Sequence, residues 1–566
     1  MSWPPRTLGA GFVAGRERLQ DRYVDVSRLP DASRLAYLRG PLHVVTEQEV
    51  ADLWADAIAN PSVEGDTRNN IYIHVPFCKS ICSFCNYERL RPSNPALLKS
   101  WLRRVIRSME TLGPAVRGLD WGSVYIGGGT PSTLPSGMLA ELFEALNTHF
   151  NIRDDAHRSF EFDPLVMSEG RVQVLARYGF AHFSFGIQTL DPEVNKAHNR
   201  GFQNRDTVKR RFEELYKHGL HDVACDFLLG LAGTNPESIL ADIEWVVETF
   251  TPKNVDVFQI SPTPEYVDEH FGGSIDAFWE HLQPFQEQAV PALKALAERA
   301  RYTVNVEGGH RYTLKRSWAP PGFTKNTPHC YSYTQLVSEA RQPMHLLGLG
   351  PSARSQIFGR AAYQGRSPED SLSDAPFHYA GHIMDFKDEV RTYLVHQLRD
   401  NNHVDRAAFT RIFGADVTEA AAVAVSAWHA ADAVTLSEDK LTLKSESRGD
   451  RLRRLLWLVP DRHLEHEVGR RQGLDLTPDG VTRLVQAIEV GQALHANHSF
   501  AGVDRNGKVM IMAPDRSQMR FRVAPGLSDG EGIRLVLESS PPREPEARKD
   551  LTKAMAQLRR VLRSAL

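Results

Sequence analysis

Short apolar runs alternate with longer amphipathic segments over residues 66–310, which is the pattern of repeated strand–helix units. The predicted strands, rich in β-branched and aromatic residues, are 71–75, 123–126, 159–162, 182–185, 223–228, 255–260 and 303–306. Helical spacing of apolar residues predicts helices at 96–111, 136–150, 168–178, 206–218, 236–250 and 277–299. This rhythm predicts an α/β fold in which parallel strands form a full or partial (β/α)6 barrel.

The segments that flank the predicted barrel follow other patterns. Residues 1–65 predict an N-terminal extension with one helix near 47–60, and residues 311–375 predict an extension of the barrel. Over 376–465, three amphipathic helices precede a strand pair that alternates about a polar turn. This order of elements predicts a winged-helix-like domain. No basic stripe for DNA accompanies it, so we expect the domain to cover the barrel mouth rather than to bind DNA.

The last segment, 466–566, predicts a small α+β module. Its expected elements are a helix at 478–494, four short strands with a hairpin turn at Asn506–Gly507, and an amphipathic C-terminal helix. A module of this size could bind substrate, a carrier protein or another subunit, and the sequence does not choose among these partners.

Composition narrows the classes of protein that are possible. The 566 residues exceed what one hydrophobic core usually supports, so several domains are expected. Lys and Arg (67) nearly balance Asp and Glu (70), which gives no global field for nucleic acid or an anionic membrane. No apolar run of 18 residues or charged-then-apolar leader is present, so we expect a cytoplasmic protein. With five cysteines, three of them clustered, a disulfide framework is not expected.

Cys78, Cys82 and Cys85 lie in one loop directly after the first predicted strand. Three thiolates this close can hold a single metal centre. They suit a four-iron cluster with one iron left open, where a small molecule can chelate the metal. Three cysteines alone do not choose the metal, so a zinc site with His74 or another histidine as fourth ligand is the alternative.

The Cys-x3-Cys-x2-Cys spacing, with the aromatic Phe84 just before the last cysteine, resembles the signature of the radical S-adenosylmethionine (SAM) superfamily. The resemblance implies a [4Fe–4S] cluster on the three cysteines, SAM on the fourth iron, and cleavage of SAM by one electron to a 5'-deoxyadenosyl radical. It also implies a small-molecule substrate and an external electron donor such as flavodoxin or ferredoxin, with no nucleic acid or membrane partner.

A glycine run, Gly127, Gly128 and Gly129 followed by Thr130, comes after the second predicted strand. Consecutive glycines let backbone amides approach a ligand, although a tight strand–helix turn alone would also explain them. One strand–helix unit after a three-cysteine loop, the run resembles the superfamily motif that contacts the methionine end of SAM.

The next strands end in Glu161-x-Asp-Pro, Gly186-x-Gln188, Asn199-Arg200 and Asp226. In this order they resemble the oxygen-independent coproporphyrinogen dehydrogenase branch of the superfamily. That match implies a SAM site with three kinds of protein group. A carboxylate would bind the methionine ammonium of SAM, a guanidinium would bind its methionine carboxylate, and an acid would bind its ribose hydroxyls. The residues of this site would be Tyr72, Glu161, Gln188, Arg200 and Asp226. Taken singly, each has a structural alternative such as a turn, a surface ion pair or a strand-end cap.

A second glycine-rich stretch, Gly348-Leu-Gly350-Pro-Ser-Ala353, follows the barrel region. It resembles a stretch that in the dehydrogenase branch lies near a second SAM molecule, and it implies that Gly348, Gly350 and Ala353 bind cofactor. The alternative is a strand followed by a glycine-rich turn without a ligand.

Two departures from the dehydrogenase separate this chain from its parent enzyme. The parent motif has a fourth cysteine two positions after the third, whereas here Asn86-Tyr87 follows Cys85. The N-terminal segment also lacks a basic cluster for four propionates. The chain therefore resembles class C radical SAM methyltransferases and cyclopropanases, and we expect C-methylation or cyclopropanation of an sp2 carbon in a conjugated natural product with two SAM molecules. The alternatives are a coproporphyrinogen-type oxidative decarboxylase or dehydrogenase and a non-catalytic haem-binding protein.

Candidate catalytic residues that would face the substrate occur between the last barrel strand and the second glycine stretch. They are His329, Cys330, Tyr331 and Tyr333, which could donate or accept a proton at a radical adduct. A packed polar loop is the alternative interpretation. Cys225, next to Asp226 on a predicted strand, is expected to be a buried small residue.

Overall fold

The structure is a computed structural model of the chain. It describes residues 7–27, 35, 38, 43–63, 65–201, 203–307, 311–318, 342–365, 378–445, 448–472, 474–476, 500–503, 508–512, 518–525 and 533–538. The chain divides into two compact units. The barrel unit comprises Asn69–Ser332 and Leu347–Ala353, and the flanking unit comprises Met1–Arg68, Tyr333–Leu346 and Arg354–Leu566.

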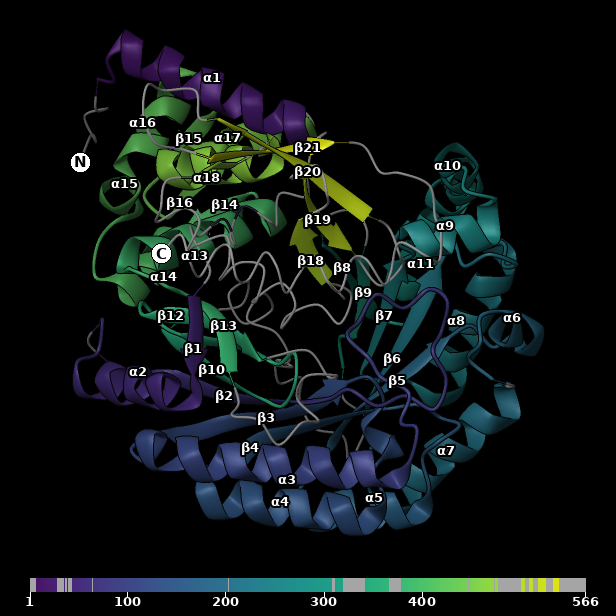
Figure 1. The fold of residues 1–566 in the computed structure, drawn as a ribbon. Coiled ribbons are helices and arrows are strands. Elements are labelled where there is room, and N and C mark those ends of the chain that lie inside the picture. Colours follow the sequence, from purple (N-terminus) through teal and green to yellow (C-terminus); the bar gives the residue numbers. More distant parts are fainter. Residues whose placement is uncertain are drawn as a thin grey trace. The chain divides into compact units, whose positions relative to one another are not determined.

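Six parallel strands, neighbours in the order in which they occur in the chain, form the centre of the barrel unit (Figure 1). They are β2 (Arg68–Val75), β3 (Asp120–Gly128), β4 (Asn151–Phe162), β5 (His182–Gln188), β6 (Asp222–Leu229) and β7 (Asn254–Gln259). Because the strands run the same way, their carboxyl ends meet at one edge of the sheet, where folds of this class bind ligands. The predicted α/β fold with a partial six-unit barrel is confirmed.

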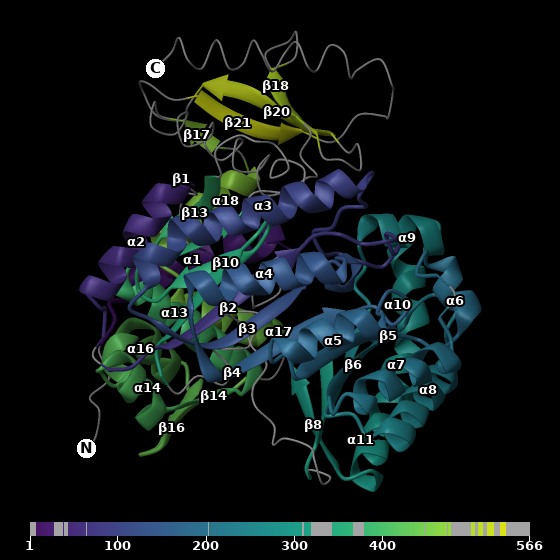
Figure 2. The same ribbon diagram turned by 90° about the horizontal axis from the view of Figure 1, so that it is seen from below.

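Helices follow the strands and lie along their outer face, as Figure 1 and Figure 2 show. They are α3 (Pro95–Leu112), α4 (Ser136–His149), α5 (Glu169–Arg177), α6 (Pro192–Ala197), α7 (Arg205–Lys217) and α8 (Pro236–Phe250), with short 3-10 turns at Gly113–Val116 and Pro131–Thr133. Local sequence sets their starts. Asn94 and Asn235 cap α3 and α8 with their side chains, and each is followed by a proline at the first helical position.

The predicted helix at 277–299 is interrupted. The structure has α10 (Ile275–Pro284), a π-helical turn (Phe285–Ala289) and α11 (Val290–Arg299), preceded by α9 (Pro264–Phe271), which the pattern did not predict. Pro284 lies inside the helical run and Pro291 occurs seven positions later. Each proline lacks the N–H that an uninterrupted α-helix would use, so the run changes its hydrogen-bond pattern there.

The strand predicted at 303–306 exists as β8 (Tyr302–Glu307) but does not pair with β7. β9 (Arg311–Arg316), which was not predicted, lies between them and pairs antiparallel with both. Only three residues separate β8 from β9, too few for the crossover that parallel neighbours need, so the two strands must form a hairpin.

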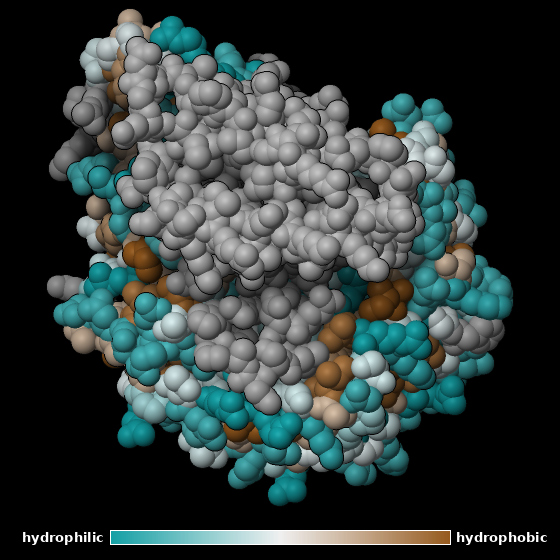
Figure 3. All heavy atoms as spheres, in the orientation of Figure 1, coloured by the Kyte–Doolittle hydropathy of each residue, from teal (hydrophilic) through white to brown (hydrophobic). Residues whose placement is uncertain are grey.

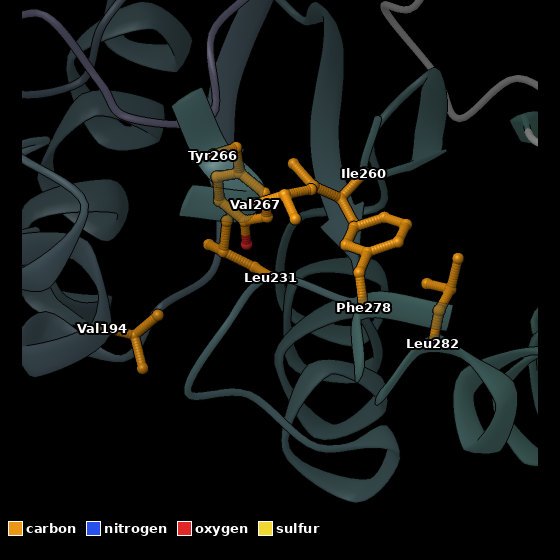
Figure 4. Close-up of a cluster of buried hydrophobic side chains, with 7 residues drawn as sticks. All are labelled: Val194, Leu231, Ile260, Tyr266, Val267, Phe278 and Leu282. Carbon is orange, nitrogen blue, oxygen red and sulfur yellow. The ribbon is translucent and has the colours of Figure 1, made fainter. Parts of the chain in front are cut away.

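An apolar group of the barrel unit lies close to the carboxyl ends of β6 and β7 (Figure 4). Its buried members are Val194, Leu231, Ile260, Tyr266, Val267, Phe278 and Leu282. Phe84, from the cysteine loop, packs against this group. Phe84, the aromatic residue of the cysteine motif, therefore attaches the loop to the hydrophobic core.

The flanking unit contains an antiparallel meander in the order β1-β13-β12-β11-β10. Its strands are β1 (His43–Thr46), β10 (Met344–Leu349, whose last three residues belong to the barrel unit), β11 (Arg354–Ile357), β12 (Ala361–Gly365) and β13 (His378–Ile383). Helix α2 (Glu47–Ala59) packs on it, since Trp54 Nε1 donates to the Tyr363 hydroxyl at 2.7 Å. Helix α1 (Ala10–Ser27) was not predicted.

The segment 376–465, for which a winged-helix-like domain stays a prediction, lies in the same unit. Its elements are α13 (Phe386–Asp400), β14 (His403–Asp405), α14 (Arg406–Phe413), α15 (Val417–Ala420), α16 (Ala422–Ala430), β15 (Val434–Leu436) and β16 (Lys440–Leu443). The three strands pair in the order β14-β16-β15. Next come α17 (Arg448–Leu455), a 3-10 turn (Leu456–Leu458) and α18 (Asp461–Gln472).

The last part of the chain forms a five-stranded antiparallel sheet in the order β17-β21-β20-β19-β18. The strands are β17 (Leu474–Leu476), β18 (Phe500–Val503), β19 (Lys508–Met512), β20 (Gln518–Pro525) and β21 (Ile533–Glu538). The pairing of β18 with β19 fits the predicted hairpin. The hairpin residues Asn506 and Gly507, the helix predicted at 478–494 and the predicted C-terminal helix lie outside the described residues.

The described surface is mostly hydrophilic on the face drawn in Figure 3, with apolar colour in small groups. The large apolar side chains that are exposed in the described ranges are Phe12, Tyr87, Ile275, Trp279, Val306 and Ile383. Among the helices that the structure describes, none combines the length and the hydropathy needed to cross a membrane.

Candidate active site

The three motif cysteines lie on a loop that begins where β2 ends. The loop is closed at its base, because Cys78 N donates to Leu90 O at 3.1 Å and Leu90 N donates to Pro76 O at 2.6 Å. A tight turn follows, in which Cys85 N donates to Cys82 O at 3.2 Å. All three thiols are partly exposed. One short, hydrogen-bonded loop therefore presents three metal ligands at the carboxyl edge of the barrel.

The glycine run at the end of β3 supports this loop through backbone hydrogen bonds. Gly129 N donates to Val75 O at 2.8 Å, and Thr130 N donates to Phe77 O at 2.7 Å. A Cβ on Gly129 would lie 2.9 Å from the Cys78 sulfur, closer than real side chains approach. The Thr130 hydroxyl lies 3.5 Å from the same sulfur, within hydrogen-bond range. The run thus brings backbone and one hydroxyl against the first cysteine.

Burial keeps the thiols of Cys78 and Cys82 protonated in the metal-free protein. It raises the pKa of Cys78 to about 12, although the hydrogen bond from Thr130 acts in the opposite direction. Burial also raises the pKa of Cys82, against the lowering effect of the Arg200 charge. Because thiolates are the metal-binding form, binding of iron must displace protons from these side chains.

His74 is not available as a fourth metal ligand. Its Nδ1 lies 2.9 Å from the Tyr72 hydroxyl and its Nε2 lies 3.0 Å from the Glu88 carbonyl. Burial lowers the pKa of His74 to about 4, so the ring is neutral, donates to Glu88 and accepts from Tyr72. Both ring nitrogens of His74 are therefore engaged within the protein, which argues against this residue as the fourth ligand of a zinc site.

Glu161, at the end of β4, is held against the glycine run. The Tyr125 hydroxyl donates to its Oε1 at 2.6 Å, and Gly128 N donates to its Oε2 at 3.1 Å. Burial raises the pKa of Glu161, and these two donors partly offset the effect. A Cβ on Gly127 would lie 2.8 Å from the carboxyl group. The absence of a side chain at this position is therefore what lets the carboxylate reach the loop.

Arg200 joins the cysteine loop to the ends of β4 and β5. Its Nη1 lies 3.9 Å from the Cys82 sulfur, an Nη2–H donates to the Gly186 carbonyl, and Asp163 lies 3.6 Å away. Burial alone would lower the pKa of Arg200, but Asp163 and Cys82 raise it overall, so the guanidinium stays charged. Gln188 lies at a β-bulge in β5 with φ +69°, a strained backbone of the kind found at binding sites.

Asp226 on β6 lies in an acidic row across neighbouring strands. Ser184 Oγ donates to its Oδ2 at 3.0 Å. Burial, with the charges of Asp256 and Glu161, raises the pKa of Asp226 to about 8. Asp256 on β7 is itself paired with Arg311 on β9 at 2.7 Å. A carboxyl group that is neutral near pH 7 can donate as well as accept, which suits recognition of hydroxyl groups.

A serine–histidine network that the motifs did not predict holds the outer part of the cysteine loop. Ser83 Oγ lies 2.7 Å from His198 Nδ1 and 2.9 Å from His270 Nε2, and Ser83 N donates to His198 O at 3.2 Å. His198 Nε2 lies 2.8 Å from the Ala232 carbonyl. With that nitrogen protonated, Nδ1 accepts from Ser83, which accepts from His270. Burial lowers the pKa of His198, which favours this neutral form.

The second glycine-rich stretch packs on β2 within the barrel unit. Gly350 has φ +91°, and a Cβ there would lie 2.7 Å from the His74 carbonyl. Trp101 Nε1 donates to the same carbonyl at 3.3 Å. Gly348 lies near the end of β10, and Ala353 is buried in the segment that follows this strand. Binding of a second SAM by these residues stays a prediction.

The candidate catalytic residues His329, Cys330, Tyr331 and Tyr333 lie outside the described residues, so their roles stay predictions. Cys225 is buried on β6 as predicted. The predicted SAM-site residues Tyr72, Glu161, Gln188, Arg200 and Asp226 all lie on the barrel strands or in the loops at their carboxyl ends. Sequence reasoning missed Tyr125, Ser83, His198 and His270, although His198 directly precedes the predicted Asn199-Arg200 pair.

Comparisons with known proteins agree with this geometry. The radical SAM superfamily model matches residues 72–246. An oxygen-independent coproporphyrinogen III oxidase of Pseudomonas aeruginosa is 29% identical over 199 residues, covering 35% of this chain and 43% of the relative. A heme chaperone, HemW, of Buchnera aphidicola is 24% identical over 201 residues, covering 35% of this chain and 53% of the relative. These alignments span about half of the relatives or less.

Structural comparison gives the same fold. The coproporphyrinogen III oxidase HemN of Escherichia coli superposes with a TM-score of 0.57 at 18% sequence identity, over 72% of this chain and 92% of that chain. At this identity the likeness concerns the fold alone.

The relatives correct the expected reaction. We expected a class C methyltransferase or cyclopropanase, yet the curated relatives described above are a coproporphyrinogen III oxidase and a heme chaperone. A second relative, the anaerobic coproporphyrinogen III oxidase of Cereibacter sphaeroides, is 28% identical over 215 residues, 38% of this chain and 47% of its own length. The prediction of methyl or methylene transfer was therefore wrong, because it rested on two missing features, a fourth cysteine and a basic cluster, rather than on a group that handles the methyl.

The residues of the barrel edge fit the cofactors of this superfamily. Three thiols occur on one loop, Gly129 leaves space beside Cys78, and the charged Arg200 faces Cys82. Glu161, held by two donors, places a carboxyl group beside the glycine run. Residues 72–246 thus match the radical SAM superfamily in sequence, and the described residues of this site fit the [4Fe–4S] cluster and SAM that this superfamily uses.

Proposed function

We propose that this chain is an enzyme that cleaves SAM reductively and removes a hydrogen atom from a small-molecule substrate, in an oxidation of the coproporphyrinogen oxidase type. The observation that carries the proposal is the joining of cluster ligands to SAM-site residues by direct contacts. Thr130 reaches Cys78, and Arg200 reaches Cys82. A site for a carboxylate and an ammonium group therefore adjoins the three thiols.

The residues of the chain divide the work of binding. Cys78, Cys82 and Cys85 hold the cluster, which supplies the electron that splits bound SAM. The guanidinium of Arg200 suits the methionine carboxylate, and Glu161 suits the methionine ammonium. Asp226 suits the ribose hydroxyls. Correct placement of these groups matters because a primary carbon radical reacts with whichever hydrogen donor it meets first.

For the oxidative outcome, the substrate loses one hydrogen atom to the deoxyadenosyl radical. A substrate with a propionate side chain then loses carbon dioxide and one electron, which an acceptor takes up, and a vinyl group remains. The similarity to coproporphyrinogen III oxidases supports this reaction class. The missing fourth cysteine, with Asn86 and Tyr87 after Cys85, argues for a substrate other than coproporphyrinogen itself.

A haem-binding role is the second candidate, because one relative is a heme chaperone. The two functions differ in what the protein does to SAM. A haem carrier would bind haem at stoichiometric level and form no 5'-deoxyadenosine.

Product analysis tests the proposal. The reconstituted protein is reduced by dithionite under anaerobic conditions with methyl-labelled SAM, and the nucleosides are identified by mass spectrometry. We expect 5'-deoxyadenosine without S-adenosylhomocysteine, and loss of both activity and cluster in Cys82→Ala but not in Cys225→Ala. Stoichiometric haem binding without 5'-deoxyadenosine would select the carrier function. Equal amounts of S-adenosylhomocysteine would contradict the oxidative assignment.

A further inference from the structure

A hollow of about 450 Å³ lies on the outer side of the cysteine loop. It is lined by Ser80, Ile81, Arg91, Lys196, Asn199 and Gly201. Ser80 and Ile81 belong to the spacer between Cys78 and Cys82, so one wall of the hollow is the backbone that carries two cluster ligands. Asn199 and Gly201 flank Arg200, whose Nη1 lies 3.9 Å from the Cys82 sulfur. Residues that line the hollow are therefore direct sequence neighbours of Cys82 and of Arg200.

The charged side chains at this hollow are mainly positive. Arg91 and Lys196 line it, and Lys79 precedes Ser80 in the loop; all three are exposed. Among the described residues, none of the three takes part in an ion pair. No acidic residue of the described ranges lines the hollow. Glu193 lies one turn before Lys196 on α6, and no ion pair joins the two side chains. The lining residues of the hollow therefore carry two positive charges and no negative one, although the whole chain carries −3.

The proposed reaction consumes one electron for each SAM cleaved, and an external donor must supply it. We propose that Lys79, Arg91 and Lys196 form the docking surface for a small acidic electron-transfer protein. The inference rests on the proposed function. In the transfer, the donor's reduced flavin or iron–sulfur centre loses one electron, and the cysteine-bound site gains it. An anionic flavin hydroquinone becomes the neutral semiquinone in this step, and no proton is released.

The exposure of the cations decides between a protein and a small anion as the occupant. A specific site for a small anion needs buried, prearranged donors, whereas the three cations here are exposed on flexible stems. Exposed charges contribute little to affinity for a small ion in water, but several of one sign steer an oppositely charged protein and set its orientation. The surface therefore fits an acidic protein, and its location beside the cysteine loop fits an electron donor.

The experiment compares two reductants on the same reconstituted full-length protein. The variant carries Lys79→Gln, Arg91→Gln and Lys196→Gln, and 5'-deoxyadenosine formation is measured with reduced flavodoxin or with dithionite. We expect the flavodoxin-driven rate to fall at least about tenfold at low ionic strength, with the dithionite-driven rate unchanged. The wild-type flavodoxin-driven rate should also fall as salt is added, and the variant should have lost that dependence.

A control with the same change of net charge carries Lys209→Gln, Arg210→Gln and Lys294→Gln, exposed residues on α7 and α11. It should keep both rates. Calorimetric titration with oxidised flavodoxin gives a readout without turnover, and affinity should weaken only in the first variant. Equal flavodoxin kinetics and affinity in the two variants would overturn the docking surface. So would a loss of the dithionite-driven rate, since the cations would then serve a small ligand. Absence of 5'-deoxyadenosine from wild type with dithionite would instead refute the proposed function.

Discussion

Ser83 Oγ and His198 Nδ1 lie 2.7 Å apart, although the two residues are separated by 115 positions in the sequence. The contact ties the turn between Cys82 and Cys85 to the segment that carries Arg200. Phe84, the next residue, packs on the apolar group around Tyr266. The cysteine loop is therefore held by a polar and an apolar attachment at the same turn.

His198→Ala tests the polar attachment. The change removes the hydrogen bond to Ser83 and leaves the Ala232 carbonyl without its donor, so we expect a loss of about 1–3 kcal/mol in unfolding free energy. Urea unfolding of the metal-free protein measures it, and iron content after reconstitution should fall as well. His429→Ala, a substitution on α16 in the flanking unit, is the control. Unchanged stability and iron content in His198→Ala would show that the network holds nothing.

Thr130→Val tests the hydroxyl that faces Cys78. Valine keeps the shape of threonine but cannot donate to the sulfur, which lies 3.5 Å away. Donors to cluster sulfurs favour the reduced, more negative state, so we expect a more negative midpoint potential in the variant. An electrochemical titration followed by electron paramagnetic resonance measures the potential, and Thr130→Ser should restore it. If valine and serine gave the wild-type value alike, the hydroxyl would have no electrostatic role.

The raised pKa of Asp226 predicts that the free energy of unfolding depends on pH. Burial and neighbouring carboxylates raise its pKa to about 8, so the folded protein holds this proton more tightly than the unfolded chain does. The stabilising effect is fully present below the ordinary carboxyl pKa, about 3.9, and is lost as the pH rises through about 8. Asp226→Asn should therefore gain stability relative to wild type as the pH rises from about 4 to about 8, in urea unfolding of the metal-free protein. The exposed Asp276→Asn should show no such trend, and a parallel pH profile for Asp226→Asn would contradict the assignment.

Residues at the amino ends of the barrel strands are expected to affect folding stability without affecting the reaction. Lys253 has 1% side-chain exposure and lies 3.6 Å from Asp222, which also contacts His182 at 3.1 Å. Asp222→Asn leaves the buried ammonium without its charge partner, and we expect a loss of about 3–5 kcal/mol in unfolding free energy. Because these residues lie at the opposite strand ends from the cysteine loop, 5'-deoxyadenosine formation per folded molecule should persist. The double change with Lys253→Met should recover part of the stability.

Periodic sequence patterns predicted the barrel because each strand–helix unit buries one face. Parallel strands end at one edge, so motifs at strand ends, such as Glu161 and Arg200, converge without knowledge of distances. The β8–β9 hairpin and the break at Pro284 escaped prediction because a short strand and a proline in a helical run are locally ambiguous. The Ser83–His198 pair escaped because its partners are distant in sequence.

The reaction outcome could not be predicted from the motifs. The cysteine loop and the glycine run bind a cofactor that many radical SAM reactions share, so they carry no information on the group that reacts. Tyr87 in place of a fourth cysteine changed one feature of the loop and was given too much weight in the prediction of methyl transfer. The similarity to coproporphyrinogen III oxidases instead favours the oxidative alternative.

Electron paramagnetic resonance of the anaerobically reconstituted and reduced protein, recorded with and without SAM, tests the central claim most directly. The account predicts a reduced [4Fe–4S] signal that changes when SAM is added, that is absent in Cys82→Ala and that is kept in Cys225→Ala. A colourless protein that carries zinc, or an iron–sulfur signal that SAM leaves unchanged, would contradict it.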